Sequence, residues 1–494
     1  MTMTTPKVFV LALLNSIFLL TGCATPPPAT NGKHPCQSVV ANASKDLSAY
    51  GLYINSNGNL YDYDKKPVAD PNSYLEKIFQ NYNRVANGDT RVQMTVFIHG
   101  GLNTSKQVSE RIENLWETML KDCKYPLFIS WRSGFPGNYF DHLFFLRRGE
   151  YESPEESESI FEIISAFIKG PIASPFVFME DSLRAIARFP ATTYEILVDQ
   201  NMIKRNLTDE STDNDALKEV EQINTLGQHD GIHIHLPPKE DETLAFTDLW
   251  SIANPVKLVT APYVDSLGTG AWNSMLRRTD LVLAKDKGIS VDQNRPEAFA
   301  SITLEQECKV NVNEIQTAVS EFFRHWQCSY RNKAIHLIGH SMGSIIANKI
   351  IAKYPNINFS KIVYMAAACS LNDIAEIISP YLNNHPNSVF YNLSLHPKRD
   401  QFENASLVDV VPRGSLLWWI DNTLGTINSF QDRTAGYWPN IYKVALKIFP
   451  TRIQHQVHLT KFGMTGEAPQ THGNFGDFPF WEEYFWHGRG LGGP

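Results

Sequence analysis

The sequence predicts an α/β fold with a mostly parallel β-sheet that helices flank on both faces. Two observations support this class. Apolar strand-like segments alternate with helix-like segments in two parts of the chain, residues 92–131 and 334–395. In addition, residues 339–343 have the sequence Gly-His-Ser-Met-Gly and join one such strand to a helix. Alternation of this kind favours parallel pairing, because each crossover helix returns the chain to the same end of the sheet.

The individual elements follow from apolar periodicity and from turn residues. Pro355 directly after the segment 344–354 favours a helix end at that point, since the residue before proline avoids helical backbone. The expected elements, in chain order, are a hairpin at 51–64, a strand at 92–98, a helix at 105–120, a strand at 126–131, a helix at 344–354, a strand at 361–367, a helix at 373–381 and a strand at 388–395.

Changes in local amino-acid composition divide the chain into five segments. Residues 133–330 carry an apolar helical stripe, prolines and charged polar stretches, and we expect a large, mainly helical cap or lid over the catalytic edge of the sheet. A second core-forming subdomain without a catalytic part is the alternative. The expected organisation is a signal peptide at 1–22, a tether at 23–50, the first part of the core at 51–132, the insertion at 133–330 and the second part of the core at 331–494.

The composition is that of an ordinary globular protein. The chain has 494 residues, of which 43% are hydrophobic and 19% are charged, so it is long enough for a large core. The net charge of -8 gives no reason to expect a nucleic-acid partner.

The amino terminus has the pattern of a secretory signal. Lys7 precedes an apolar stretch at 8–20, and Thr21, Gly22 and Cys23 follow. A cysteine directly after small residues resembles the cleavage site of bacterial lipoproteins. The resemblance implies that Cys23 becomes the acylated mature terminus of a membrane lipoprotein, in the outer membrane and facing the periplasm. The alternatives are a plain signal peptide or a buried cysteine without such a role.

The cysteine count constrains the disulfide pattern. Six cysteines are present, and removal of an acylated Cys23 leaves five, so at least one thiol stays free or pairs elsewhere. Cys308 and Cys328 flank a predicted helix and are candidates for a bond in an oxidising compartment. Spacing alone does not fix the pairing.

Ser341 is the candidate nucleophile. A serine at a sharp turn from strand to helix exposes its hydroxyl and strains its backbone, and glycines at 339 and 343 allow so tight a turn. An ordinary strand-turn-helix connection is the alternative. The backbone N–H of Met342 is a candidate donor to the oxyanion. A second donor is expected from the loop after the first long strand, at Gly101 or Leu102.

A serine hydroxyl needs a base, and the base needs an acid that orients it. In the chain order typical of this turn, the acid comes next and the histidine last. His472 lies in a polar turn near the carboxyl terminus and is the candidate base. Asp400, just past the strand at 388–395, is the favoured acid, while Glu403 and Asp409 remain alternatives.

These residues together resemble the α/β-hydrolase superfamily, over residues 92–132 and 331–480. The resemblance implies an α/β-hydrolase sheet of eight strands flanked by helices, a Ser-acid-His triad and no cofactor. It assigns the nucleophile to Ser341, the base to His472 and the acid to Asp400. It does not extend to the insertion, and a fold does not by itself fix a substrate.

A metal site is not expected. His233 and His235 lie on one face of a strand-like segment, but no carboxylate or cysteine pattern accompanies them.

The predicted function is therefore that of a membrane-anchored serine hydrolase that cleaves carboxylic esters through an acyl-enzyme. Esterase-like or lipase-like substrates are expected, with lipids favoured by the anchor and the apolar insertion. The alternative is a non-catalytic binding or scaffold module on the same fold. Substrate identity and oligomeric state do not follow from the sequence.

Overall fold

A computed structural model provides the structure of the protein. It describes residues 36–55, 57–64, 66–101, 105–131, 183, 231–237, 269, 272–284, 308, 317–403, 414–425, 427–464 and 468–488. The expected signal peptide and Cys23 lie outside the described residues, as do Asp409 and most of the expected insertion.

The described part of the chain is built around one nine-stranded sheet with the order β2-β1-β4-β3-β6-β7-β8-β9-β5. All neighbouring strands pair in parallel except β1 and β2, which form the hairpin expected near the amino terminus. The strands are β1 (Gly51–Ile54), β2 (Leu60–Tyr61), β3 (Gln93–Ile98), β4 (Lys124–Trp131), β5 (His233–His235), β6 (Ile335–His340), β7 (Phe359–Met365), β8 (Val389–Ser394) and β9 (Val457–Lys461).

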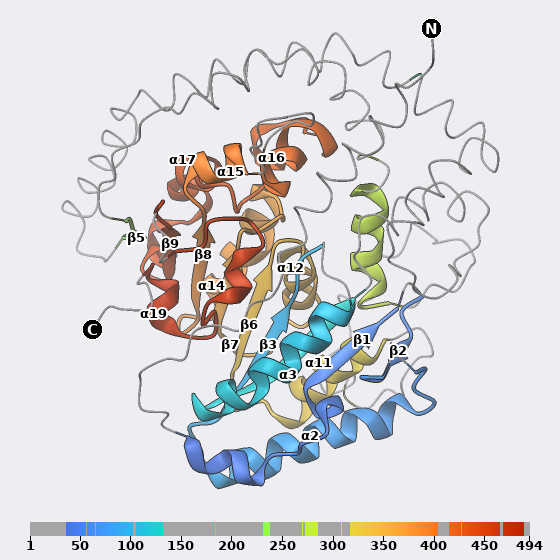
Figure 1. Ribbon diagram of the computed structural model, residues 1–494. Coiled ribbons are helices and arrows are strands. Elements are labelled where there is room, and N and C mark those ends of the chain that lie inside the picture. Colours follow the sequence, from blue (N-terminus) through green and yellow to red (C-terminus); the bar gives the residue numbers. More distant parts are fainter. Residues whose placement is uncertain are drawn as a thin grey trace, which may run out of the picture.

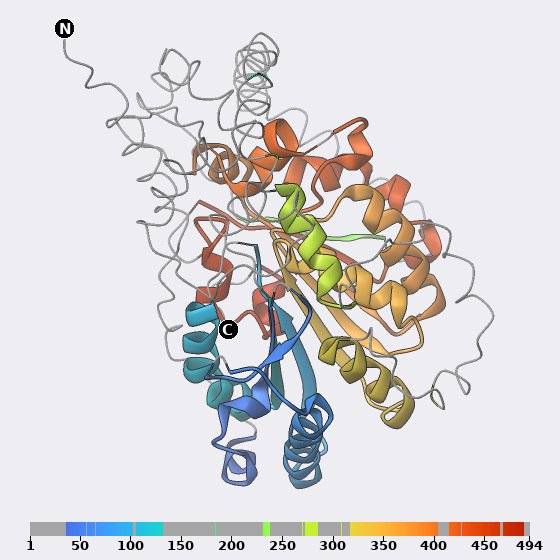
Figure 2. The same cartoon turned by 90° about the vertical axis from the view of Figure 1, so that its right-hand side faces the viewer.

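Helices cover both faces of this sheet, as Figure 1 and the turned view in Figure 2 show. Helix α3 lies on one face, while α11 and α12 lie on the other. The helices are η1 (Gln37–Asn42), η2 (Leu47–Tyr50), α2 (Pro71–Gly88), α3 (Ser105–Lys121), α11 (Ala318–Ser329), α12 (Gly343–Lys353), α13 (Leu371–Asp373), η4 (Ile374–Ile378), α14 (Ser379–Asn384), α15 (Pro397–Phe402), α16 (Leu416–Trp419), η5 (Ile420–Leu424), η6 (Phe430–Asp432), α17 (Trp438–Ile448), α18 (Thr451–Gln454), η7 (Asn474–Asp477) and α19 (Glu483–Trp486).

The central strands are buried along their length, which explains their nearly continuous apolar sequences. Every residue of β6 is buried, and so are all but the first residue of β3 and of β4. A strand covered on both faces has no solvent side and therefore lacks the apolar-polar alternation of an edge strand. The predicted mostly parallel α/β class is confirmed.

Two details differ from the expectation. The helix expected at 373–381 is a composite in which α13 passes into the π-helical turn η4 and then into α14. The described sheet has nine strands where eight were implied, because β5 extends the edge beyond β9. The strand β5 comes from within the expected insertion, so part of that segment belongs to the sheet itself.

A second described piece of the expected insertion packs on the core. Residues 272–281 are helical. The Lys349 ammonium on α12 donates to the Thr279 hydroxyl at 2.7 Å and forms an ion pair with Asp280. The Thr317 hydroxyl, which also caps α11, donates to the Val282 carbonyl at 2.6 Å. These contacts fix the end of the 272–281 helix beside α12.

Two disulfides link distant parts of the described chain. Cys308 and Cys328, the candidate pair, are bonded, and Cys36 is bonded to Cys123, a pair that the sequence did not indicate. The Cys36–Cys123 bond joins the segment before η1 to the turn between α3 and β4. Cys369 has a free thiol and is buried. Among the helices that the structure describes, none combines the length and the apolar character needed to cross a bilayer.

Gly343 is a position where the core leaves no room for a side chain. A Cβ atom there would lie 2.2 Å from the Ile98 carbonyl oxygen, a backbone atom of β3 that cannot move independently of the sheet. We expect Gly343→Ala to lower the free energy of unfolding by at least about 2 kcal/mol, the cost of overpacking a core. Urea unfolding followed by circular dichroism measures this.

Gly473→Ala is the matched control, because nothing lies within 4 Å of a Cβ atom at that position. It should change the free energy of unfolding by less than about 0.5 kcal/mol. Equal stabilities of the two variants would contradict the close approach of α12 to β3.

Candidate active site

The Ser341 turn connects the carboxyl end of β6 to the first residue of α12. Ser341 has a φ of 52°, in the left-handed region that non-glycine residues rarely occupy. Its N–H donates to the Met365 carbonyl at 2.8 Å, and its own carbonyl accepts from the Ser344 hydroxyl at 2.6 Å and the Ala368 N–H at 3.1 Å. These bonds from β7 and α12 hold the strained conformation and fix the direction of the side chain.

His472 is in hydrogen-bonding contact with Ser341. Its Nε2 atom lies 2.8 Å from the Ser341 Oγ atom, although 131 positions separate the two residues in the chain. His472 lies between β9 and the turn η7, and its side chain meets Ser341 at the carboxyl end of β6. Both residues are buried. The structure therefore brings together the two residues that the sequence nominated as nucleophile and base.

His340, directly before the serine, holds the His472 backbone. Its Nε2 atom lies 2.8 Å from the His472 carbonyl oxygen, so this nitrogen carries the proton and donates it. The two rings also pack against each other, with centroids 5.4 Å apart. Sequence reasoning missed this contact. The only signal was the place of His340 within the Gly-His-Ser-Met-Gly segment, which does not reveal what the ring touches.

Of the two candidate acids that the structure describes, Asp400 and Glu403, Glu403 is the one in contact with His472. Its Oε2 atom accepts a hydrogen bond from the His472 backbone N–H at 2.9 Å. The Nδ1 atom of His472 is buried and has no hydrogen-bond partner among the described residues, so neither Glu403 nor Asp400 reaches it directly. Glu403 follows α15 directly, three positions beyond Asp400.

Asp400 lies in α15 and is fully buried. Neither of its carboxylate oxygens accepts a hydrogen bond of normal geometry. Burial raises the pKa of Asp400 well above 3.8; the Ser415 side chain opposes this shift and the charge of Glu403 adds to it. Burial thus favours the neutral form of this carboxyl group, whereas an acid that supports His472 must carry negative charge.

The loop after β3 lies against the serine turn. A Cβ atom at Gly100 would be 2.8 Å from the Ser341 Cβ atom, and one at Gly101 would be 2.4 Å from the Met342 Sδ atom. The same Cβ atom at Gly101 would lie 2.6 Å from the Met275 Cε atom, so the 272–281 helix packs over this loop. Gly101 and Met342 are thus adjacent, while Leu102, the alternative donor, lies outside the described residues.

The His99 ring fixes the start of this loop. Its Nδ1 atom lies 2.7 Å from the Gly100 carbonyl, and its Nε2 atom accepts from the Trp131 N–H at 3.1 Å. Both ring nitrogens are therefore used for loop structure. Burial lowers the pKa of His99 to about 3, which keeps the ring neutral.

Burial also sets the charge state of the other groups in the site. It lowers the pKa of His472 well below 6.5, and the neighbouring His340 lowers it further. Burial likewise lowers the pKa of His340 to about 4. It raises the pKa of Glu403 to about 7, against the effect of the hydrogen bond from His472. At neutral pH the His472 ring is thus neutral, with one ring nitrogen able to accept a proton.

The raised pKa of Glu403 makes stability depend on pH. Its ordinary value is 4.5 and its folded value is about 7, so between these values the folded protein binds the proton more tightly than the unfolded chain does. The contribution of Glu403 to the free energy of unfolding is fully present below about pH 4.5 and is lost as pH rises through 7. The shift in the pKa of Glu403 corresponds to a loss of about 3 kcal/mol in the free energy of unfolding at high pH.

We therefore expect Glu403→Gln, which removes the buried charge and keeps an acceptor for the His472 N–H, to raise the free energy of unfolding at pH 8.5 by up to about 3 kcal/mol. At pH 4.5 the variant and the wild type should agree within about 0.5 kcal/mol. Urea unfolding at the two pH values tests this, with Glu376→Gln on the exposed side of η4 as control. The same difference at both pH values would contradict a buried ionisable Glu403.

One comparison with known proteins gives a match. Residues 309–413 match the family model described as "Serine aminopeptidase, S33". This segment includes the Ser341 turn, Asp400 and Glu403, and ends before His472. The search of curated proteins and the search of solved structures each found no match. The parallel sheet with its flanking helices has the α/β-hydrolase architecture, and the matched segment supports a hydrolase built on it.

Proposed function

We propose that this protein is a serine hydrolase that cleaves carboxylic esters through a covalent acyl-enzyme. The observation that carries the proposal is the 2.8 Å contact between His472 Nε2 and Ser341 Oγ at a left-handed turn. A neutral imidazole at this distance from a serine hydroxyl is the arrangement in which the hydroxyl loses its proton as it attacks a carbonyl.

The reaction follows from these positions. The Ser341 Oγ atom attacks the ester carbonyl while His472 Nε2 accepts the hydroxyl proton. The tetrahedral oxyanion is held by backbone N–H groups, for which Met342 and Gly101 are the proposed donors. His472 then gives its proton to the leaving alcohol, and an acyl group remains on Ser341. Water repeats the sequence and releases the acid.

We assign the acid of the triad to Glu403. Its carboxylate already binds the backbone N–H of His472, and the Nδ1 atom of the same residue is only four bonds away and has no partner. We infer that the Glu403 side chain rotates to bring one oxygen to Nδ1 when the ring becomes positively charged. The pKa of about 7 allows Glu403 to be ionised at and above neutral pH.

Membrane anchoring through an acylated Cys23 is part of the proposal. Its support is the charged start, the short apolar stretch and the small residues before Cys23. Anchoring at a bilayer would bring a soluble catalytic body close to lipidic esters, which makes long acyl chains the favoured substrate class. Cys23→Ala should move the protein from the membrane fraction to the soluble fraction; continued membrane association would contradict the anchor.

Ser341→Ala tests the mechanism. We expect the variant to lose at least about 10³-fold in kcat/KM on p-nitrophenyl esters and to stop reacting with a fluorophosphonate probe, because both require the hydroxyl. Ser73→Ala is the control: it removes an exposed hydroxyl in the first turn of α2, so this variant should still be labelled. A Ser341→Ala variant with full turnover would refute the proposal, and an unlabelled wild type would favour the non-catalytic binding or scaffold module.

The same assay separates substrate classes. Esters of increasing acyl length should be cleaved with kcat/KM rising beyond about eight carbons if lipids are the substrates, because each buried methylene contributes about 0.8 kcal/mol. A preference for short chains would contradict the lipidic class. Faster cleavage of aminoacyl p-nitroanilides than of any ester would instead favour the peptidase activity named in the matched family description.

Glu403→Gln and Asp400→Asn compare the two carboxylates. We expect Glu403→Gln to lower kcat/KM by about 10³-fold, since the protonated imidazole loses its counter-charge. In the wild type kcat/KM should rise with pH through about 7 as Glu403 ionises, and this dependence should be absent from Glu403→Gln. Asp400→Asn should keep activity within about tenfold. The reverse ranking would assign the acid to Asp400.

A further inference from the structure

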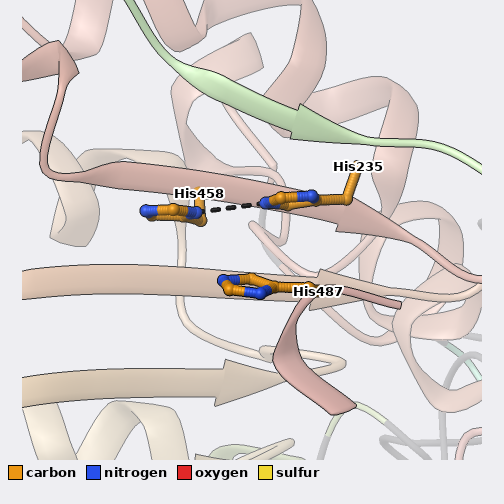
Figure 3. Close-up of side chains that lie close together, drawn as sticks. All are labelled: His235, His458 and His487. Carbon is orange, nitrogen blue, oxygen red and sulfur yellow. Dashed lines mark hydrogen bonds between the residues drawn. The ribbon is translucent and has the colours of Figure 1, made fainter. Parts of the chain in front are cut away.

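Three histidines from distant parts of the chain meet at the β5 edge of the sheet (Figure 3). His235 ends β5, His458 is the second residue of β9, and His487 follows α19. Each offers a ring nitrogen, and the three nitrogens all lie within 4.8 Å of one another. The group is separate from the Ser341 turn, because β7 and β8 lie between β6 and β9.

The spacing of the first two rings matches that of ligands on one ion. His235 Nε2 and His458 Nδ1 are 3.1 Å apart, joined by a hydrogen bond, and their rings are nearly coplanar at 6°. Two nitrogens bound to one tetrahedral Zn²⁺ at 2.0–2.1 Å are roughly 3.3 Å apart. The two nitrogens are therefore already at the separation that one ion requires, and each ring would tilt to direct its lone pair at an ion that replaces the shared proton.

The third ring needs a rotation. His487 stacks on His235 with centroids 4.7 Å apart, so its lone pairs do not point at the other two nitrogens. A turn about its side-chain torsions would aim one nitrogen at the ion. The backbone is in position for this, since the Thr460 hydroxyl on β9 donates to the Trp486 carbonyl at 2.6 Å and fixes the residue before His487.

The chemistry of the group selects the class of ion. The three ligands are imidazoles, without a carboxylate or thiolate among them. Imidazole suits zinc, copper and nickel, whereas calcium and magnesium take oxygen ligands. A water molecule would complete a four-coordinate site.

The position suggests what the ion would do. The strand β5 has three residues and pairs only with β9 in the described sheet, so few hydrogen bonds hold it there. An ion bound by β5, β9 and the end of α19 would fasten this short edge strand to the core. A metal that binds the folded state but not the unfolded chain adds directly to stability.

We propose that His235, His458 and His487 form a binding site for one divalent transition-metal ion of the zinc class, with a structural role at the sheet edge. The site is independent of the esterase proposal.

The test uses the full-length protein treated with a chelator and then titrated with Zn²⁺ by calorimetry and with Co²⁺ by absorption. We expect one equivalent of Zn²⁺, a rise in the midpoint of thermal unfolding, and a Co²⁺ spectrum of tetrahedral type. His458→Gln and His487→Gln should each weaken affinity at least about 100-fold, because even the loss of groups that only orient metal ligands costs 10–100-fold.

His455→Gln is the matched control, since His455 is exposed and lies three positions before His458. It should bind like the wild type. Circular dichroism checks that each variant is folded, and His487→Gln serves if His458→Gln is not. Failure of the wild type to bind Zn²⁺, or binding retained in both ligand variants, would overturn the site. Fluorophosphonate labelling of Ser341 in the metal-free protein reports separately on the proposed esterase activity.

Discussion

The close approach of α12 to β3 is the constraint on which the active-site architecture depends. Gly343 leaves no room for a side chain beside the Ile98 carbonyl, and this packing forces the chain to turn within two residues of β6. Ser341 therefore adopts a left-handed backbone, at a cost of about 1–3 kcal/mol. The hydrogen bonds with Met365 and Ala368 hold that conformation. Core packing thus positions the backbone that carries the hydroxyl, and the hydroxyl itself contacts His472 Nε2 at 2.8 Å.

Burial then gives each ionisable group its charge state. The pKa of His472 is lowered well below its ordinary range and the pKa of Glu403 is raised to about 7, both chiefly by loss of water. The imidazole is therefore neutral and ready to accept a proton. Once it is charged, a nearby carboxylate has a large effect on its stability, because both groups are buried. Burial of the Glu403 carboxylate thus lowers the stability of the folded protein. It also strengthens the attraction between this carboxylate and a charged His472, which the proposed reaction needs.

Much of this arrangement could be predicted from the sequence because the signals are local. The Ser341 turn is marked by two glycines between a strand-like and a helix-like run, and the alternation around it gave the fold class. The choice between Asp400 and Glu403 could not be made in this way. They lie three positions apart, and which one meets His472 depends on how the segment after β9 returns across α15.

The sequence by itself determined the α/β class, the strained serine turn and a short set of candidate partners, since periodicity and turn chemistry are properties of neighbouring residues. Only the tertiary structure decided which partners meet. Glu403 accepts a hydrogen bond from the His472 backbone N–H, and His340 donates one to the His472 carbonyl. The tertiary structure also brought His235 within 3.1 Å of His458 across 223 positions of sequence. Contacts of this kind depend on strand order, and no local pattern records which strands become neighbours.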